Sequence, residues 1–318
     1  MSGRKRTQIR RGVPEPEGQV KRGVSLRKVR STVHDHESSD VDDVRPGTVK
    51  SQYFSKEGEP QRLGEEFFNQ PCINLAKAFL GKILIQQFVR RHLVYFKYFL
   101  IDRDWYWCVG VQMVVETEAY LGEEDKASHS AGGKCTARNT AMFMKPGTIY
   151  VYPIYGIYLC INVSSQGEGA AVLLRALEPL NGLRLMKQLR TARRREEARP
   201  LKDKELCNGP SKLCQALDIP RCFDRRDLAS DPEVWLERDT QIGPQEPGLR
   251  EVVSASRIGI DSHGEWATKP LRFYLRGHRC VSVVNKQAEI QIHSLANNVI
   301  SDFASSSVDV CDGDTGQN

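Results

Sequence analysis

Residues 148–177, TIYVYPIYGIYLCINVSSQGEGAAVLLRAL, alternate between apolar runs and glycine-containing turns. The runs Thr148–Tyr152 and Ile157–Val163 flank Tyr155-Gly156 and predict a β-hairpin, because β-branched and aromatic residues favour strands and glycine favours the turn. The apolar run Ala170–Leu177 predicts a buried strand. This stretch therefore predicts a hairpin followed closely by a core strand.

The flanking sequence continues the pattern in both directions. We expect strands at Lys82–Phe88, Val111–Tyr120, Arg250–Ile260 and Leu271–Arg276. We expect helices at residues 64–81 with an interruption at Pro71, at Leu180–Glu197 and at Ser211–Leu217. Because few regular helices connect the strands, the pattern predicts an α+β domain and not a doubly wound sheet.

The two ends of the chain differ in composition from its centre. Residues 1–60 lack apolar periodicity and predict a disordered basic tail, while residues 290–318 predict a polar C-terminal tail. Residues 1–30 contain ten Lys and Arg against two Glu, a net charge of +8, whereas the whole chain of 318 residues carries +6 and the remainder therefore −2. The globular region, expected at 61–289, would bind a polyanion through a local patch, with the tail adding non-specific attraction.

Several classes of protein are disfavoured by the sequence. Nine scattered cysteines without a C-x-x-C pair, and no N-terminal apolar segment, predict a reduced intracellular protein without a metal site. Residues 92–113 are aromatic-rich but carry interrupting charges, which argues against a membrane helix. Phosphate-loop, dinucleotide, zinc-protease and serine-hydrolase motifs are absent. GRKR at residues 3–6 could be a nuclear address, a solvated charge run or part of a mitochondrial presequence; we expect a nuclear protein, with a mitochondrial pool possible.

The first candidate for chemistry is Val114–Tyr120, VVETEAY. Strand alternation places Glu116, Glu118 and Tyr120 on one face. Two carboxylates and a tyrosine on one face could form a general-base site. The commoner explanation of such a pattern is a pair of solvated glutamates on an edge strand.

The second candidate is the tyrosine-rich hairpin. Tyrosines on strand faces usually pack in the sheet, but Tyr155 at the predicted tip is harder to explain by packing. It could be a wedge inserted into a base stack. Arg138, Lys145 and Arg175 lie nearby in the sequence and could contact phosphates.

Taken together, these motifs resemble the alkyladenine DNA glycosylases, also called 3-methyladenine or N-methylpurine DNA glycosylases. The resemblance runs from about Gln61 to about Glu289, through VVETEAY, His129 in ASHSAGG, TARNTAMFMKPGTIYVYPIYGIYLCINVSSQGEGAAVLLRALEPL, NGPSKLCQAL and KPLRFYLRG. It implies a single compact domain with a curved, mainly antiparallel sheet, flanking helices and a protruding hairpin that intercalates into DNA.

The activity that this resemblance implies is base-excision repair. A monofunctional glycosylase of this family flips damaged purines, of the 3-methyladenine, 7-methylguanine, hypoxanthine or ethenoadenine type, out of duplex DNA. Water then hydrolyses the N-glycosidic bond and leaves an abasic site. The resemblance implies no cofactor, no metal and no membrane, with double-stranded damaged DNA as the partner. We expect a monomer.

The resemblance also assigns roles to individual positions. Glu118 matches the general base and Arg175 the arginine beside the attacking water, where its charge would keep Glu118 ionised; Glu116 is then structural. The remaining matches are the base pocket and the DNA contacts: Tyr120, His129 and Tyr152 around the flipped purine, Asn162 against the 2-amino group of guanine, Tyr155 as the intercalating residue, and Arg138, Lys145, Ser211 and Lys212 at the phosphates.

Two departures from the family pattern qualify these expectations. Residues 90–110 form a long insertion where the family has a short turn; it could extend the hairpin, bind a partner or be a gene-model error. Pro153 stands before the wedge where an aliphatic residue is expected, and it removes one N–H. Two other functions therefore stay in view. One is a non-catalytic damaged-DNA-binding protein of the same fold, and the other is a small-molecule N-glycosidase, which would leave Tyr155 unexplained.

Overall fold

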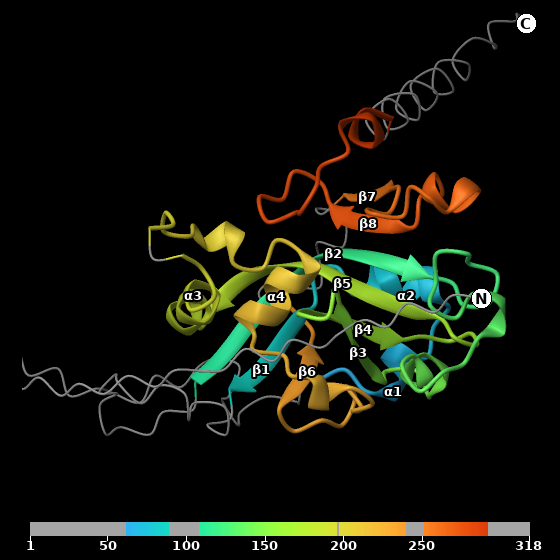
Figure 1. The fold of residues 1–318 in the computed structure, drawn as a ribbon, viewed down its shortest axis with the longest axis horizontal. Coiled ribbons are helices and arrows are strands. Elements are labelled where there is room, and N and C mark those ends of the chain that lie inside the picture. The colour runs from blue at the N-terminus through green and yellow to red at the C-terminus, as the bar shows by residue number, and fades with distance from the viewer. Residues whose placement is uncertain (1–61, 89–107, 196, 240–250, 292–318) are drawn as a thin grey trace, which may run out of the picture. The chain divides into compact units, whose positions relative to one another are not determined.

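An antiparallel sheet of eight strands organises the computed structural model, which describes residues 62–88, 108–195, 197–239 and 251–291 (Figure 1). Six strands lie in the order β3-β4-β5-β2-β1-β6, while β8 pairs with both β2 and β7. The strands are β1 (Ile83–Phe88), β2 (Cys108–Tyr120), β3 (Ile149–Ile154), β4 (Tyr158–Ser164), β5 (Ala171–Asn181), β6 (Val234–Glu237), β7 (Val252–Ala255) and β8 (Arg272–Leu275). The α+β prediction is confirmed.

Strand β2 lies in the interior of the sheet and exchanges partners along its length. Its first half pairs with β1, from Phe88 opposite Cys108 to Ile83 opposite Met113. Its second half pairs with β8, whereas β5 runs along its other side. The exchange coincides with an irregularity in the register between Val114 and Glu116. Because β2 has a partner on both sides, it is not an edge strand with unpaired backbone N–H and C=O groups.

The helices are short and lie against the sheet. They are α1 (Glu65–Phe68), α2 (Cys72–Ala78), α3 (Leu183–Thr191) and α4 (Pro210–Ala216). Pro71 separates α1 from α2, as the sequence predicted, because proline is favoured at a helix start and not in its interior. The Thr117 hydroxyl of β2 donates to the Ala76 carbonyl across 2.8 Å, so α2 covers the face of β2 that carries Thr117. α4 packs against β4 and β5.

The predicted hairpin is confirmed as β3 and β4, paired from Ile149 opposite Val163 to Ile154 opposite Tyr158. At its tip the Ile157 N–H donates to the Ile154 carbonyl. Tyr155 and Gly156, between them, both have positive φ, 51° and 75°. That conformation suits glycine, but it costs a residue such as tyrosine on the order of 1–2 kcal/mol.

Several boundaries differ from the prediction. Among the described residues, the helix predicted at Leu180–Glu197 is confined to α3, and the strand predicted at Arg250–Ile260 to β7. β6 was missed, because four residues after a run rich in Asp and Pro give little periodic signal. Residues 108–110 of the expected insertion belong to β2, while 89–107 lie outside the described residues, as do residues 1–61 and 292–318 of the predicted tails.

Candidate active site

The two glutamates of β2 share a buried face of the sheet. Both Glu116 and Glu118 have no exposed surface. One arginine of β5, Arg175, lies 3.3 Å from Glu116 Oε1 through Nε and 3.2 Å from Glu118 Oε1 through Nη1. The alternation prediction is therefore confirmed, and the alternative of solvated glutamates on an edge strand is wrong.

Glu118 receives three hydrogen bonds from three different parts of the chain. Arg175 and the Ile258 backbone N–H, at 2.8 Å, donate to Oε1, and the Tyr120 hydroxyl donates to Oε2 across 3.0 Å. Burial raises the pKa of Glu118, and these three donors oppose that rise. Burial, with Glu118 as the next cause, also raises the pKa of Tyr120 well above its usual value, so its hydroxyl keeps its proton at neutral pH. Glu118 is therefore a buried carboxylate held in one orientation by Arg175, Tyr120 and Ile258.

Glu116 sits in a different environment from Glu118. Its Oε1 accepts a hydrogen bond from Arg272 Nη1 across 2.8 Å, and its Oε2 accepts one from the Ser282 backbone N–H across 2.7 Å. Arg272 is itself 1% exposed and also donates to the Ser256 and Val283 carbonyls. Glu116 therefore joins β2, β8 and the segment around Ser282, which fits the structural role expected for it.

Aromatic rings gather beside these carboxylates. His129 and Tyr152 meet edge to face with ring centroids 4.6 Å apart. Tyr150 stacks on Tyr152 at 5.2 Å, and its hydroxyl lies 2.9 Å from His129 Nδ1. Partial burial and the nearby Arg138 cation lower the pKa of His129, so the imidazole is neutral at pH 7. Sequence reasoning did not single out Tyr150 as the group that orients His129.

The loop that carries His129 is anchored on both sides. The Asn139 amide donates to the His129 carbonyl across 3.0 Å, and the Ser130 hydroxyl donates to the Gly169 carbonyl across 2.6 Å. Gly169 has φ of 67°, and a Cβ there would lie 2.7 Å from the Ser130 Cβ. Glycine is therefore required for this close approach. Asn162, on β4 opposite Tyr150, is 4% exposed and donates to the Tyr150 carbonyl.

The hairpin tip presents apolar side chains to solvent. Tyr155 is 90% exposed and Ile157 is 66% exposed. This exposure excludes core packing as the explanation of Tyr155. Pro153 lies within β3, opposite Leu159, so the proline does not interrupt the hairpin. Its carbonyl accepts a hydrogen bond from Arg138.

The four predicted phosphate contacts lie in different settings. Arg138 is exposed, and its guanidinium carbon lies 5.5 Å from the centroid of the Tyr152 ring. Lys145 forms ion pairs with Glu65 and, at 3.0 Å, with Asp227, so its charge is already compensated. Ser211 lies in the first turn of α4, and the Lys212 ammonium donates to Asn208. The contact of these residues with DNA stays a prediction.

Neither a metal site nor a membrane span emerges from the described part of the chain. No group of three or more His, Cys, Asp or Glu side chains within residues 62–291, apart from the undescribed gaps, could hold a metal ion. In the same residues, no helix is long and apolar enough to cross a bilayer.

The geometry just described can be set beside known proteins. Residues 97–279 match the family model of methylpurine-DNA glycosylases, which is more than half of the chain. This chain belongs to the methylpurine-DNA glycosylase family. It is accordingly an enzyme that acts on DNA, a base-excision-repair glycosylase for alkylated bases.

Individual methylpurine-DNA glycosylases support the assignment. The chain is 55% identical over 249 residues to the DNA-3-methyladenine glycosylase of Homo sapiens, covering 77% of this chain and 76% of that protein. It is 52% identical over 264 residues to the protein of that name from Rattus norvegicus, covering 81% and 75%. A putative 3-methyladenine DNA glycosylase of Clostridium perfringens strain SM101 is 38% identical over 226 residues, which cover 70% of this chain and 98% of that protein.

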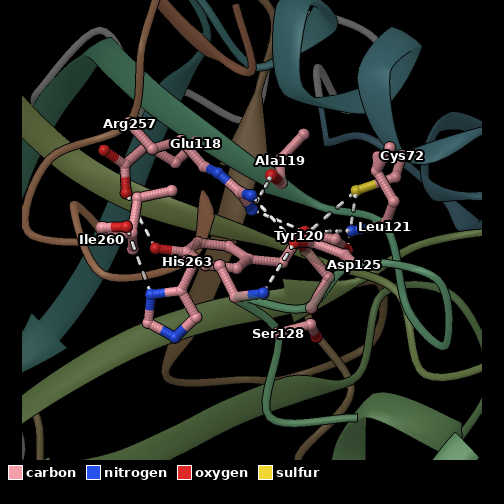
Figure 2. A network of polar contacts seen from close by, with 12 residues as sticks. Cys72, Glu118, Ala119, Tyr120, Leu121, Asp125, Ser128, Arg257, Ile260 and His263 are labelled. Atoms are coloured by element: carbon pink, nitrogen blue, oxygen red, sulfur yellow. Dashed lines mark hydrogen bonds and ion pairs between the residues drawn. The ribbon is translucent and has the colours of Figure 1, made fainter. Parts of the chain in front are cut away.

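This methylpurine-DNA glycosylase also contains a buried ion pair that sequence reasoning missed. Arg257 donates through Nη1 and Nη2 to the two carboxylate oxygens of Asp125, at 2.5 and 2.8 Å (Figure 2). The two residues are 132 positions apart. Asp125 follows the predicted strand Val111–Tyr120, and Arg257 falls within the strand predicted at Arg250–Ile260 but lies after the observed β7. Asp125 lies between Glu124 and Lys126 in a run of charged residues, so nothing in the sequence marked it as a buried partner of Arg257.

Proposed function

We propose that this glycosylase excises damaged purines from duplex DNA with a water molecule activated by Glu118. The observation that supports the proposal is the pairing of a fully buried carboxylate, held by Arg175 and Tyr120, with the ring cluster of His129 and Tyr152. Buried ionisable groups with specific charge partners are typical of catalytic sites.

In this proposal Glu118 is the general base. It takes a proton from water as the water oxygen attacks the anomeric carbon of the sugar. The bond from that carbon to the purine nitrogen breaks, and the purine leaves with the bonding electrons. Arg175 holds Glu118 ionised before the attack, because an adjacent cation favours the charged carboxylate. The ionised carboxylate also stabilises the positive charge that develops on the sugar.

The ring cluster is the proposed pocket for the flipped base. A purine must leave the helix because its glycosidic bond is inaccessible within the stack. Tyr120, His129 and Tyr152 would enclose it, and electron-rich rings favour alkylated purines that carry positive charge. Asn162 would crowd the 2-amino group of normal guanine, which is a repulsive selectivity device.

Tyr155 is the proposed wedge that fills the space left by the flipped nucleotide. Its 90% exposure in the free protein and its place at the hairpin tip support this role. Side chains inserted between base steps unstack DNA in the same way in other DNA-bending proteins. We further propose that the enzyme acts as a monomer in the nucleus, with 3-methyladenine, 7-methylguanine, hypoxanthine and ethenoadenine as substrates.

The proposal is tested with a duplex that contains hypoxanthine, followed by alkaline cleavage of abasic sites. We expect cleavage by the wild type and binding without cleavage by Glu118→Gln, because the amide keeps the shape of the side chain but cannot accept a proton. Loss of a general base typically lowers the rate by about 10²–10⁴. Single-turnover excision by the variant within tenfold of the wild type would exclude Glu118 as the base.

The comparison variant is Glu116→Gln. It should keep most of the excision rate per folded molecule, because Glu118 still pairs with Arg175, but it removes the carboxylate that pairs with the buried Arg272 and should lower the melting temperature. Binding of the lesion duplex by the wild type without cleavage would contradict the proposed excision of hypoxanthine.

A further inference from the structure

Arg257 and Asp125 tie three segments of the chain together beside Glu118. Neither side chain of the pair has any exposed surface. Beyond its two bonds to Asp125, Arg257 donates to the Ala119 carbonyl of β2 across 3.0 Å. Asp125 also accepts from the backbone N–H groups of Leu121 and Ala127 at 3.1 and 3.0 Å. The pair therefore fixes the end of β2, the turn after it and the segment after β7.

Arg257 is linked to two of the three groups that donate hydrogen bonds to Glu118: it packs on the Tyr120 ring and directly precedes Ile258 in the chain. Its guanidinium carbon lies 4.6 Å from the centroid of the Tyr120 ring, whose hydroxyl donates to Glu118 Oε2 (Figure 2). The next residue along the chain is Ile258, whose N–H donates to Glu118 Oε1. One donor is thus held by packing on the guanidinium and the other by direct chain connection.

Stability alone does not account for this pair. A buried ion pair is often no more stable than apolar residues of the same volume, because two charges must be desolvated. The Nε of Arg257 also has no hydrogen-bond partner among the described residues. The guanidinium is therefore placed for Asp125, Ala119 and Tyr120 although one of its own N–H groups stays unsatisfied.

We propose that Arg257, clamped by Asp125, is a positioning residue that fixes the Tyr120 hydroxyl and the Ile258 N–H on the Glu118 carboxylate. The inference rests on the proposed role of Glu118 as the base. The physical reason is that a displacement of a catalytic group by about 1 Å can lower the rate about a hundredfold, so the groups that hold Glu118 in place affect the rate. Lysine at this position keeps the charge but has neither the planar fork for Asp125 nor a flat face for Tyr120.

The pH dependence of excision separates positioning from mere stability. The other ionisable groups around Glu118 are Arg175 on β5, Glu116 and Tyr120 on β2, Tyr152 on β3 and Cys160 on β4. Arg257→Lys leaves all of these charges in place and keeps the positive charge at position 257. Loosening of the Ile258 and Tyr120 hydrogen bonds removes two contributions that lower the pKa of Glu118. The acid limb of the rate profile should then move to higher pH.

The experiment compares single-turnover excision of hypoxanthine by wild type and Arg257→Lys between about pH 4.5 and 9. We expect a plateau rate about a hundredfold lower and an acid limb shifted to higher pH. The matched control is Arg226→Lys, because Arg226 also makes a two-pronged contact with an aspartate, through Nε and Nη2 with Asp231, and shares no hydrogen-bond partner with Glu118 among the described residues. The control should lower the melting temperature and leave the acid limb where it is in the wild type.

An Arg257→Lys variant with a wild-type limb and a rate within threefold of wild type would overturn the inference. If that protein does not fold, amide exchange in the wild type decides. The Ile258 amide should be protected like the Ala119 amide, which donates to the Leu271 carbonyl in the sheet. Exchange of Ile258 at the rate of an open loop would also overturn the inference. Active Glu118→Gln would remove the proposed function itself, whereas inactive Glu118→Gln with normal Arg257→Lys removes only the positioning role.

Discussion

Two glutamates, two positions apart on one strand, show how much a residue's role depends on its neighbours. Glu116 is saturated by Arg272 and by a backbone N–H from another segment. Glu118 instead has the Tyr120 hydroxyl at one oxygen and the Ile258 N–H at the other, beside the aromatic cluster, while Arg175 contacts both glutamates. Strand alternation puts both on one face but does not show which of the two has the catalytic role. The difference between their environments comes from β8 and from the segments around Ser282 and Ile258, which lie far along the chain.

The raised pKa of Glu118 predicts a pH-dependent difference in stability between the wild type and Glu118→Gln. Burial favours the protonated carboxyl in the folded state, so its pKa lies above the unfolded value of about 4.3. A group shifted in this direction contributes its full stability below the unfolded pKa and loses it as the pH rises through the folded pKa. The wild type should therefore lose stability relative to Glu118→Gln over that window, and the difference should level off above it.

Thermal melting of both proteins from about pH 3.5 to 8 checks this prediction, since all other ionisable groups are shared. A difference in melting temperature that stays constant with pH would show that the pKa of Glu118 is the same in the folded and unfolded states. The activity should show the same pKa shift, because only the ionised carboxylate can act as a base. Its acid limb should lie above the ordinary range of a glutamate.

At the scale of elements, the hairpin β3–β4 has one end buried in the sheet and an exposed tip. Tyr150 at its base is 1% exposed, while Tyr155 at its tip is 90% exposed and has a positive φ. The same strand pair thus supplies Tyr152 to the proposed pocket, with Tyr150 stacked on it, and exposes Tyr155 to solvent. A tyrosine that has a strained backbone and is also exposed contributes little to folding, so its presence at the tip is better explained by a role in binding.

Tyr155→Ala should leave the melting temperature nearly unchanged and lower excision. The ring makes little contact in the free protein, but its loss removes the group that would occupy the vacated stack. Unstacking costs a few kcal/mol, least for a mispaired base, so the loss should be greater for a lesion in a stable pair than in a mismatch. The control is Ile290→Ala, which removes a 67%-exposed apolar side chain from a segment with no proposed DNA contact. Equal losses on paired and mismatched hypoxanthine would contradict the wedge.

The loop between β2 and β3 depends on one close approach of the backbone. Gly169→Ala would place a methyl group 2.7 Å from the Ser130 Cβ at a φ of 67°. Gly169 lies between β4 and β5, whereas Gly132 lies in the β2–β3 loop itself, where Gly132→Ala at a φ of 68° meets nothing within 4 Å. The φ strain, on the order of 1–2 kcal/mol, is common to both substitutions. Only Gly169→Ala adds the close contact with Ser130, so it should destabilise more than Gly132→Ala and also slow excision by moving His129. Urea unfolding and single-turnover rates measure the two effects, and equal destabilisation by both substitutions would exclude the packing requirement.

At the scale of the whole molecule, local sequence patterns predicted where strands lie in the chain, but they did not predict where each strand lies in the sheet or which of its side chains are buried. The hairpin and β5 were predictable because each is a contiguous apolar run bounded by glycine. The interior position of β2 was not, since it depends on pairing with β8 more than 150 residues later, as in Glu116 opposite Tyr274. For the same reason the burial of the two glutamates and the Arg257–Asp125 pair was not predictable. Long-range pairing leaves no periodic mark in either segment.

The charge distribution of the whole chain leads to a prediction about binding to undamaged DNA. Residues 1–30 carry a net charge of +8, while the rest of the chain carries −2. Each phosphate neutralised by a Lys or Arg contributes about −0.9 to the slope of log K against log salt. Removal of residues 1–60 should therefore weaken non-specific binding and flatten that slope. Single-turnover excision at saturating protein should stay intact, because the proposed site residues all lie beyond residue 115.

A full-length variant with the ten Lys and Arg of residues 1–30 replaced by Gln separates the effect of charge from the effect of chain length and should behave like the truncation. Fluorescence anisotropy of an undamaged duplex over a range of salt concentrations provides the measurement, and a slope equal to that of the wild type in both variants would show that the tail does not contact DNA.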